Sequence, residues 1–132
     1  MTSFNEFGLA EPILRALAQE KYTNPTPIQA QTIPLACQSR DVIGIAQTGT
    51  GKTAAFALPI LNHLLNKRTR PAQKSCRVLV LSPTRELSAQ IGDSFRAHGR
   101  HIRPLEVALA IRGLPITRQL RALARGVDIL AA

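Results

Sequence analysis

Apolar side chains recur along this chain with two alternating patterns, one typical of helices and one typical of strands. Spacings of three or four residues, as in Leu9, Ile13 and Leu17, place apolar side chains on one face of a helix. Unbroken apolar runs of four to six residues suit strands that are buried on both faces. Helical patterns predict helices over residues 9–17, 28–36, 56–64, 87–95 and 116–123.

Four short apolar runs, three between these helices and one after the last of them, predict strands over residues 41–46, 77–81, 106–111 and 127–131. Alternation of strand and helix predicts the α/β fold class, with a parallel sheet flanked by helices and joined by right-handed crossovers. No helix follows the last strand in this sequence. We therefore expect a partial domain with an unpaired apolar edge at Val127–Ala131, which would lower its solubility.

Charge distinguishes the two halves of the chain. The 132 residues suffice for one domain, and 45% hydrophobic with 19% charged residues is a globular composition. Residues 67–132 hold 13 of the 17 Lys and Arg against four acidic residues, which accounts for the whole net charge of +9. Asn66–Ser75 is a polar, basic segment interrupted by Pro71 and predicts a surface loop. Either a polyanion such as RNA or DNA binds the second half of the chain, or its arginines form a solvated face, or acidic residues of a continuation balance them.

Neither end of the sequence predicts a targeting signal or a membrane anchor. No basic segment precedes an apolar run at the N-terminus, and no apolar run approaches the roughly 18 residues of a membrane span. We expect a cytoplasmic protein with Cys37 and Cys76 as reduced thiols. His98 and His101 have no cysteine at ligand spacing, so we expect no metal site there.

The segment Ala46–Thr53 reads AQTGTGKT and lies between a predicted strand and a predicted helix, the context of a Walker A phosphate loop. Gly49 and Gly51 allow successive backbone N–H groups to point at phosphate oxygens, and the following helix adds the positive end of its dipole. Lys52 would reach the β and γ phosphates, and the Thr53 hydroxyl would ligate Mg²⁺. The segment begins with alanine where the general pattern has glycine, and an ordinary glycine-rich turn is the alternative interpretation.

Three segments in order resemble the motifs of DEAD-box RNA helicases. Phe4 followed by KYTNPTPIQ (Lys21–Gln29) resembles the Q motif, AQTGTGKT matches motif I, and PTRELSAQ (Pro83–Gln90) is similar to motif Ia. The overall character is similar to bacterial RhlE-type members. This resemblance implies a partial RecA-like P-loop fold, with residues 1–30 as the Q-motif region and residues 31–132 as an incomplete first helicase ATP-binding domain.

The resemblance implies that the ligand is ATP. A glutamine amide presents a donor beside an acceptor, which matches the N7 and 6-amino edge of adenine, so Gln29 would distinguish ATP from GTP. Phe4 and Tyr22 would stack on the base, although Phe4 taken alone would fit an ordinary core aromatic. Lys21 stands where the family usually has glycine, and Tyr22 where it usually has phenylalanine. The expected ATP-binding residues are Phe4, Tyr22, Gln29, Thr48, Gly49, Thr50, Gly51, Lys52 and Thr53, with Thr53 also holding Mg²⁺.

Motif Ia implies sequence-independent contacts with the backbone of single-stranded or duplex RNA through Pro83, Thr84 and Arg85. These residues come at a predicted helix start, where free N–H groups and the helix dipole favour a phosphate. Considered alone, Arg85 would fit an exposed helix-start pair with its acidic neighbour. The family's next RNA contact is a Gly-Gly turn, which reads Arg112–Gly113 here. The contact at Gly113 is therefore either lost or replaced by an arginine contact.

The acidic DEAD motif has no counterpart among the 132 residues. The resemblance implies that RNA-stimulated ATP hydrolysis and duplex unwinding belong to a longer parent, and that this chain has no complete catalytic set and no turnover alone. One alternative is a self-standing nucleotide or RNA-binding module without turnover. Another is a small-molecule kinase, which would need neither PTRELSAQ nor the glutamine motif.

Overall fold

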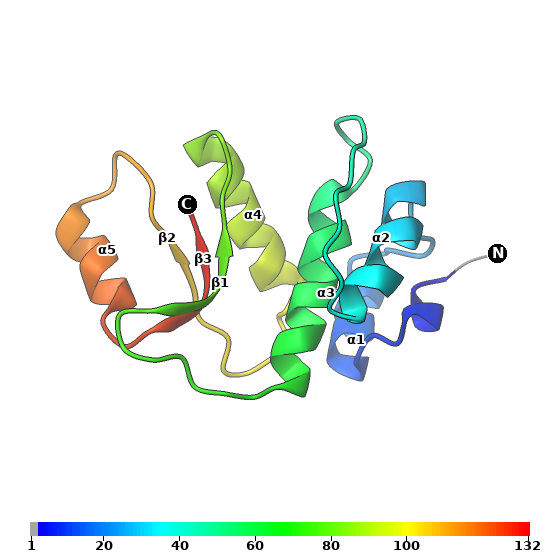
Figure 1. Cartoon of the computed structure of the whole chain (residues 1–132), viewed down its shortest axis with the longest axis horizontal. Helices are drawn as coiled ribbons and strands as arrows, with labels where there is room; N and C mark the ends of the chain where they lie inside the picture. The colour runs from blue at the N-terminus through cyan, green and yellow to red at the C-terminus, as the bar shows by residue number, and fades with distance from the viewer. Residues whose placement is uncertain (1–2) are drawn as a thin grey trace. The chain divides into compact units, whose positions relative to one another are not determined.

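The computed structural model describes residues 3–132, which fold as two compact units. The first unit contains the chain up to Lys67 together with Ala97–Ile102, and the second contains Arg68–Arg96 and Arg103–Ala132. The described chain has five α-helices and a parallel sheet of three strands (Figure 1). The predicted α/β fold class is confirmed.

Helices build the first unit. In chain order they are the short 3-10 helix η1 (Phe4–Phe7), α1 (Glu11–Gln19), α2 (Pro27–Cys37) and α3 (Lys52–Asn66). Pro59 lies buried inside α3 without ending it. The core of this unit consists of aliphatic side chains that are at most 2% exposed: Ile13, Leu17, Ile33, Leu58 and Leu61. Their helical spacing in the sequence is what brings them onto facing sides of the three helices.

The second unit contains the parallel sheet with two helices. Its strands are β1 (Cys76–Val80), β2 (Val107–Leu109) and β3 (Val127–Ala131), and its helices are α4 (Arg85–His98), whose last two residues belong to the first unit, and α5 (Ile116–Leu123). Helix α4 approaches β2 closely at Gly92, where an added Cβ would lie 3.0 Å from the side chain of Leu109. Glycine at this position therefore permits close packing of helix on strand.

β3 is the central strand of the sheet, which has the order β1-β3-β2. It pairs in parallel with β1 through Val78↔Ile129 and with β2 through Val107↔Ile129. Val127, Ile129 and Ala131 are at most 3% exposed. The predicted exposed edge at Val127–Ala131 is therefore wrong, because the crossover connections insert the last strand between the two earlier ones.

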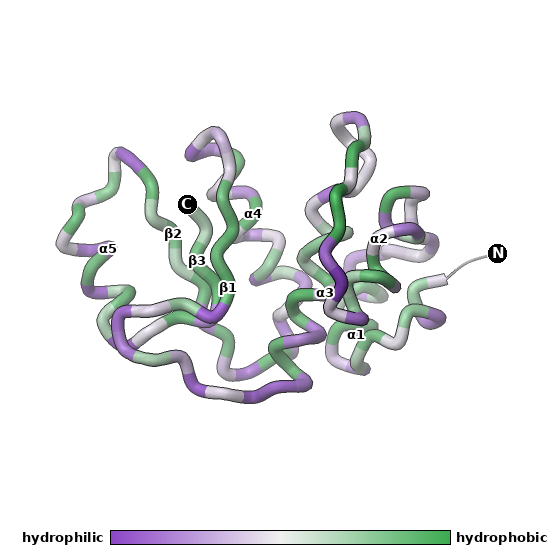
Figure 2. Tube along the Cα trace, in the orientation of Figure 1, coloured by the Kyte–Doolittle hydropathy of each residue, from purple (hydrophilic) through white to green (hydrophobic). Residues whose placement is uncertain are grey.

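Residues 41–47 are extended but form no strand, so the strand predicted over Asp41–Ala46 is wrong. Ile43 is 92% exposed and Ile45 is 90% exposed. Backbone groups form a strand only where a neighbouring strand pairs with them, and the paired strands of the described chain all lie in the second unit. Figure 2 shows this segment to be as hydrophobic as the strands of the sheet, so hydropathy alone could not separate the two cases.

Candidate functional site

The phosphate loop lies in the first unit, between the extended segment and α3. Gly49 has a φ of 83° and Gly51 a φ of 81°, in the left-handed region that side chains disfavour. Thr50 Oγ1 donates a hydrogen bond of 2.6 Å to the carbonyl of Gln47, which tightens the turn. The sequence predicted a glycine-dependent loop at this place, and the backbone angles agree with it.

Lys52 and Thr53 begin α3 directly after this loop. The Lys52 Nζ donates a hydrogen bond of 2.7 Å to the carbonyl of Ala46, so the ammonium group spans the loop from its end to its start. The Lys52 side chain is exposed and Thr53 is half-buried. Free N–H groups of the first helical turn and the lysine ammonium together make this a site of positive potential.

Gln29 connects α2 to the phosphate loop. The side chain is 3% exposed, and its Nε2 donates a hydrogen bond of 3.1 Å to the carbonyl of Gly51. Its Oε1 accepts a hydrogen bond of 2.9 Å from the backbone N–H of Thr26, which completes a capping box at the start of α2. A Cβ at Gly51 would lie 2.3 Å from the Gln29 Nε2, so the loop backbone passes directly against this amide.

The two rings predicted to stack on adenine differ in exposure. Phe4 is 4% exposed, whereas Tyr22 is 42% exposed. The Phe4 ring packs edge-on against Phe7 with centroids 6.0 Å apart, and lies 6.3 Å from the ring of Tyr22. The structure therefore presents Tyr22 as the ring with a free surface and buries Phe4, because η1 turns the latter into the helical core.

A cluster of ionisable side chains, Glu20, His98 and Arg100, lies beside Tyr22 within the same unit. His98 is 4% exposed and its ring meets the Tyr22 ring edge-on with centroids 5.5 Å apart. Its Nδ1 lies 2.8 Å from Glu20 Oε2, and both atoms are buried. Glu20 Oε1 accepts a hydrogen bond of 2.7 Å from Arg100. Burial lowers the pKa of His98, and the carboxylate of Glu20 opposes this effect without cancelling it.

Lys21, two residues after the end of α1, takes the left-handed conformation with a φ of 62°. The N–H of Tyr22 bonds to the carbonyl of Leu17 at 2.9 Å, and the N–H of Lys21 bonds to the carbonyl of Ala18 at 3.1 Å. This is the Schellman pattern of a helix C-terminus, which glycine normally serves. One of the two positions where this chain departs from the Q-motif pattern, Lys21, is therefore a position that favours glycine for a backbone reason.

In the second unit, α4 begins at the segment predicted to contact RNA. The Thr84 Oγ1 accepts a hydrogen bond of 3.1 Å from the backbone N–H of Leu87, so Thr84 caps the helix. The hydroxyls of Ser82 and Ser88 bond to each other across the first turn. Pro83, Thr84 and Arg85 are all exposed, which leaves this helix start accessible to an anion.

The side chain of Arg85 lies beside the turn at Gly113 in the second unit. Arg85 Nη1 donates a hydrogen bond of 3.4 Å to the carbonyl of Arg112, and a Cβ at Gly113 would lie 2.9 Å from the same nitrogen. Gly113 has a φ of 90°, and Gln119 Nε2 bonds to the carbonyl of Ile111 at 2.8 Å, which supports the turn from α5. The side chain of Arg112 is exposed beside this turn.

Sequence reasoning missed two of these supporting residues. The Thr26-x-x-Gln29 spacing is a capping-box signal that could have revealed the second role of Gln29. Gln119 carries no such signal, because its partner carbonyls lie in a turn whose geometry no local pattern defines. Among residues 3–132, no three His, Cys, Asp or Glu side chains gather as a metal site. Within the same residues, no helix is long and apolar enough to cross a membrane.

A glycine-rich loop between an extended segment and a helix, together with a parallel α/β sheet, defines the chain as a P-loop α/β protein. The sequence model of the DEAD/DEAH box helicase family matches residues 26–132. The chain therefore belongs to this family.

Proteins with similar sequences are named as RNA helicases. The chain is 51% identical over 130 residues to the ATP-dependent rRNA helicase RRP3 of Pyricularia oryzae, which is 98% of this chain and 23% of that protein. It is 44% identical over 129 residues to the ATP-dependent RNA helicase DeaD of Escherichia coli, covering 98% of this chain and 20% of that protein. The chain thus spans about a quarter or less of the length of these relatives.

Solved structures agree with the fold. The RNA helicase Prp28 of Chaetomium thermophilum bound to ADP matches with a TM-score of 0.87 and 37% identity, over 98% of this chain and 31% of that chain. A DEAD box protein of Methanococcus jannaschii matches with a TM-score of 0.85 and 30% identity, over 99% of this chain and 34% of that chain. The predicted RecA-like domain class is confirmed, and the RhlE-type assignment stays a prediction.

Proposed function

We propose that this chain binds ATP with Mg²⁺ at its AQTGTGKT loop and RNA backbone at the start of α4, as part of an ATP-dependent RNA helicase. One observation carries the proposal: the Gln29 amide, predicted to recognise the base, bonds at 3.1 Å to the Gly51 carbonyl of the phosphate loop. The residue proposed to recognise the base and the loop proposed to bind the phosphates are thus hydrogen-bonded to each other within the first unit. Relatives named ATP-dependent RNA helicases, and a neighbour bound to ADP, support the nucleotide and the reaction class.

The loop residues suit a triphosphate. Lys52 would exchange the Ala46 carbonyl for β and γ phosphate oxygens, while the N–H groups of Thr48 to Thr53 surround the anion. Mg²⁺ is usually held by substrate phosphates, water and a small number of protein oxygens. The single hydroxyl of Thr53 at the helix start fits that coordination, and the ion would neutralise phosphate charge.

The base would lie against Tyr22 and be read by Gln29. One amide N–H of Gln29 and one lone pair of its oxygen are used within the protein, and each group has a second position available. Adenine offers a matching acceptor and donor, whereas guanine offers an acceptor in place of the amino group. Phe4 would support Tyr22 from the core.

RNA would contact the second unit through Pro83, Thr84 and Arg85, with Gly113 in the adjoining turn. Phosphoryl transfer also needs carboxylates that organise the metal and the attacking water. The 132 residues contain no DEAD string, so the proposal for this chain is binding without turnover. Hydrolysis and unwinding are proposed for a helicase that supplies those groups, and a cytoplasmic location is proposed with them.

Nucleotide-dependent thermal protection tests the proposal. ATP and ADP are expected to raise Tm more than GTP and GDP do, and Gln29→Ala is expected to abolish that preference. Gln31→Ala, on the exposed side of the same helix, should retain it. Equal protection by adenine and guanine nucleotides in the unmodified chain would refute the role of Gln29.

A further inference from the structure

A second set of cations lies at the end of the sheet where the three strands begin. The start of α4 lies at the other end, which follows the C-terminus of β1. Three strands that run in parallel share one amino edge, at which the segments before β1, β2 and β3 meet. Each of these segments carries exposed basic residues: Arg68, Arg70 and Lys74 before β1, Arg103 before β2, and Arg125 before β3. We call these five residues the amino-edge basic surface.

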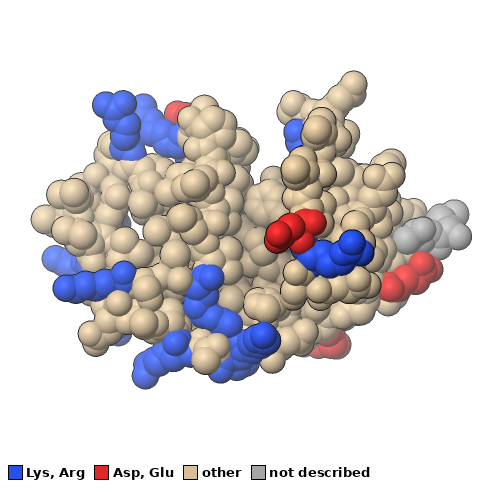
Figure 3. Space-filling view, in the orientation of Figure 1, with Lys and Arg blue, Asp and Glu red and all other residues tan. Residues whose placement is uncertain are grey.

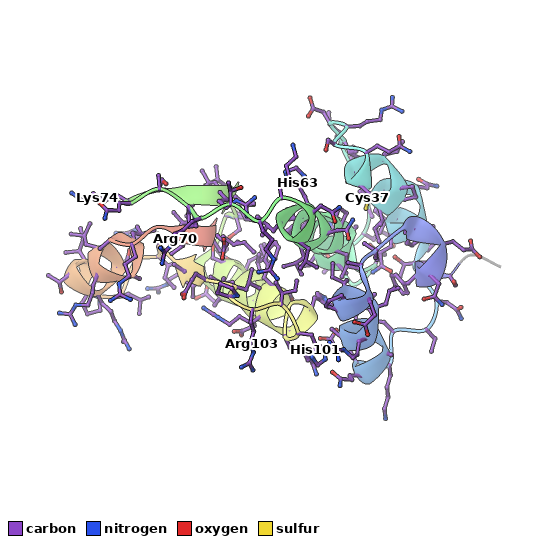
Figure 4. The ribbon with its side chains drawn as sticks, turned by 90° about the horizontal axis from the view of Figure 1, so that it is seen from below. Cys37, His63, Arg70, Lys74, His101 and Arg103 are labelled. Atoms are coloured by element: carbon purple, nitrogen blue, oxygen red, sulfur yellow. The ribbon has the colours of Figure 1, made fainter. Side chains whose placement is uncertain are left out.

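Close contacts hold the three segments against one another. Arg68 Nη1 donates a hydrogen bond of 3.0 Å to the carbonyl of Arg103, which joins the first segment to the second. A Cβ at Gly126 would lie 2.3 Å from the carbonyl oxygen of Ala72, which places the third segment directly against the first. Figure 4 labels Arg70, Lys74 and Arg103 among the side chains of the second unit. These cations therefore belong to one surface rather than to unrelated loops.

The part of the loop that carries Lys74, Ala72–Ser75, is an ordered turn. The Ser75 hydroxyl donates a hydrogen bond of 2.6 Å to the carbonyl of Ala72, and the Ser75 N–H bonds to the same carbonyl at 3.2 Å. Lys74 takes a left-handed φ of 58° within this turn. Because the turn is already fixed, binding an anion there costs less conformational entropy than ordering a free loop.

Little negative charge offsets this surface. The neighbouring acidic residues are Glu106 and Asp128, and Asp128 already accepts a hydrogen bond of 2.9 Å from the N–H of Glu106. None of the five cations forms an ion pair with a carboxylate within the described residues. Figure 3 shows Lys and Arg gathered along the lower margin of the second unit. The cations are thus available to an external anion.

We propose that the amino-edge basic surface is a second contact for RNA backbone phosphates, separate from the contact at the start of α4. The inference extends the proposed RNA binding. A strand of five residues is roughly 17 Å long, so Arg70 at one edge and Arg85 at the other meet different phosphates. Four of the five cations are arginines, whose planar donors suit phosphate oxygens.

The chemistry of the surface favours RNA over a protein or membrane partner. Between the cations lie polar or small residues, Thr69, Gln73 and Ser75 among them, with no aromatic ring in the loop. Protein interfaces concentrate aromatic and apolar side chains at their centre, and membrane-surface helices need an apolar face. Sequence-independent phosphate recognition needs only distributed positive charge and polar donors.

The test is the salt dependence of binding to a labelled single-stranded RNA of mixed sequence, measured for the full 132-residue chain. Each phosphate contact contributes a slope of about 0.7 in log affinity against log salt concentration. Arg70→Gln with Lys74→Gln is expected to lower the slope by about 1.4. Arg15→Gln with Arg40→Gln removes two exposed charges from the first unit and should leave it unchanged.

Arg85→Gln separates this inference from the function on which it rests. If both surfaces contact RNA, the effects of Arg85→Gln and of the Arg70/Lys74 pair add. If only Arg85→Gln lowers the slope, RNA binding at α4 stands and the second contact is refuted. If the unmodified chain shows no salt-dependent RNA binding, both proposals fail. Stronger competition by polyglutamate than by unlabelled RNA would also overturn the inference, because it would identify an acidic protein as the better partner.

Discussion

At the residue scale, Lys21, which follows the C-terminus of α1, takes a backbone conformation that most side chains avoid. Its φ of 62° belongs to the left-handed region, where a Cβ crowds the following carbonyl and costs roughly 1 kcal/mol or more. The two Schellman hydrogen bonds that follow it require this angle. The lysine side chain is exposed, so no burial compensates for the strain.

Lys21→Gly is therefore expected to stabilise the chain by about 0.5–1 kcal/mol. Chemical denaturation monitored by circular dichroism would measure the change. Lys21→Ala keeps the Cβ while removing the charge, and should leave stability nearly unchanged. A gain from alanine equal to that from glycine would assign the effect to charge and contradict the backbone explanation.

A second effect at the residue scale is the contribution of His98 to the pH dependence of folding stability. Burial lowers its pKa below the ordinary value, with Glu20 acting in the opposite direction and Arg100 reinforcing the decrease. As pH falls through about 6.5, the unfolded chain takes up the proton before the folded chain does. Stability from the neutral His98 is thus fully present above that pH and is lost progressively below it.

We expect Tm to fall by a few degrees between pH 7.5 and pH 5.5 through this residue, and His98→Gln to remove that component. His63→Gln, an exposed histidine in the same unit, is the matched control. The chain has one tyrosine and no tryptophan, so intrinsic fluorescence follows Tyr22 beside His98. A pH profile that is identical in His98→Gln and the unmodified chain would contradict this assignment.

At the element scale, α4 depends on its cap as well as on its packing. Four N–H groups at a helix start have no partner within the helix, and Thr84 satisfies one of them through its hydroxyl at 3.1 Å. The same residue belongs to the proposed RNA contact. Capping and RNA binding therefore have to be separated by the choice of substitution.

Thr84→Ala is expected to destabilise the chain by about 1 kcal/mol through loss of the cap. Thr84→Ser retains the capping oxygen and should preserve most of the stability. Differential scanning calorimetry of the three proteins measures this directly. Equal Tm values for the alanine and serine variants would show that the methyl group, and not the hydroxyl, matters at this position.

At the scale of the whole molecule, the segment 41–47 carries the two most exposed of the large apolar side chains among the described residues. Ile43 and Ile45 are at least 90% exposed, and the segment lacks a strand partner. Extended backbone with free hydrogen-bonding groups and apolar side chains is a template for association between copies. The chain is therefore expected to associate through this segment, and not through β3.

Ile43→Lys with Ile45→Lys is expected to reduce concentration-dependent association, as measured by sedimentation velocity. Ile116→Lys offers a comparison, because Ile116 is 71% exposed but lies in a helix whose backbone is already paired. An equal reduction by Ile116→Lys would show that exposed apolar area alone causes the association. Unchanged association in the double variant would exclude the segment.

Local features of this chain were predictable from sequence because their causes lie within a few residues. Helical spacing predicted α1, α3 and α4, since a helix needs only a compatible period and one apolar face. Gly49 and Gly51 predicted a loop with left-handed angles, because glycine adopts these without strain. The order of the three motifs likewise predicted the family before any contact was known.

Tertiary structure alone decided the features that depend on distant partners. An apolar run became β3 at the centre of the sheet, while another became the exposed segment 41–47, because strand formation requires a neighbour and hydropathy does not identify one. Phe4 became buried, and Gln29 became bonded to Gly51, 22 residues away. In each case the deciding free energy comes from contacts between segments far apart in the chain, which no local pattern encodes.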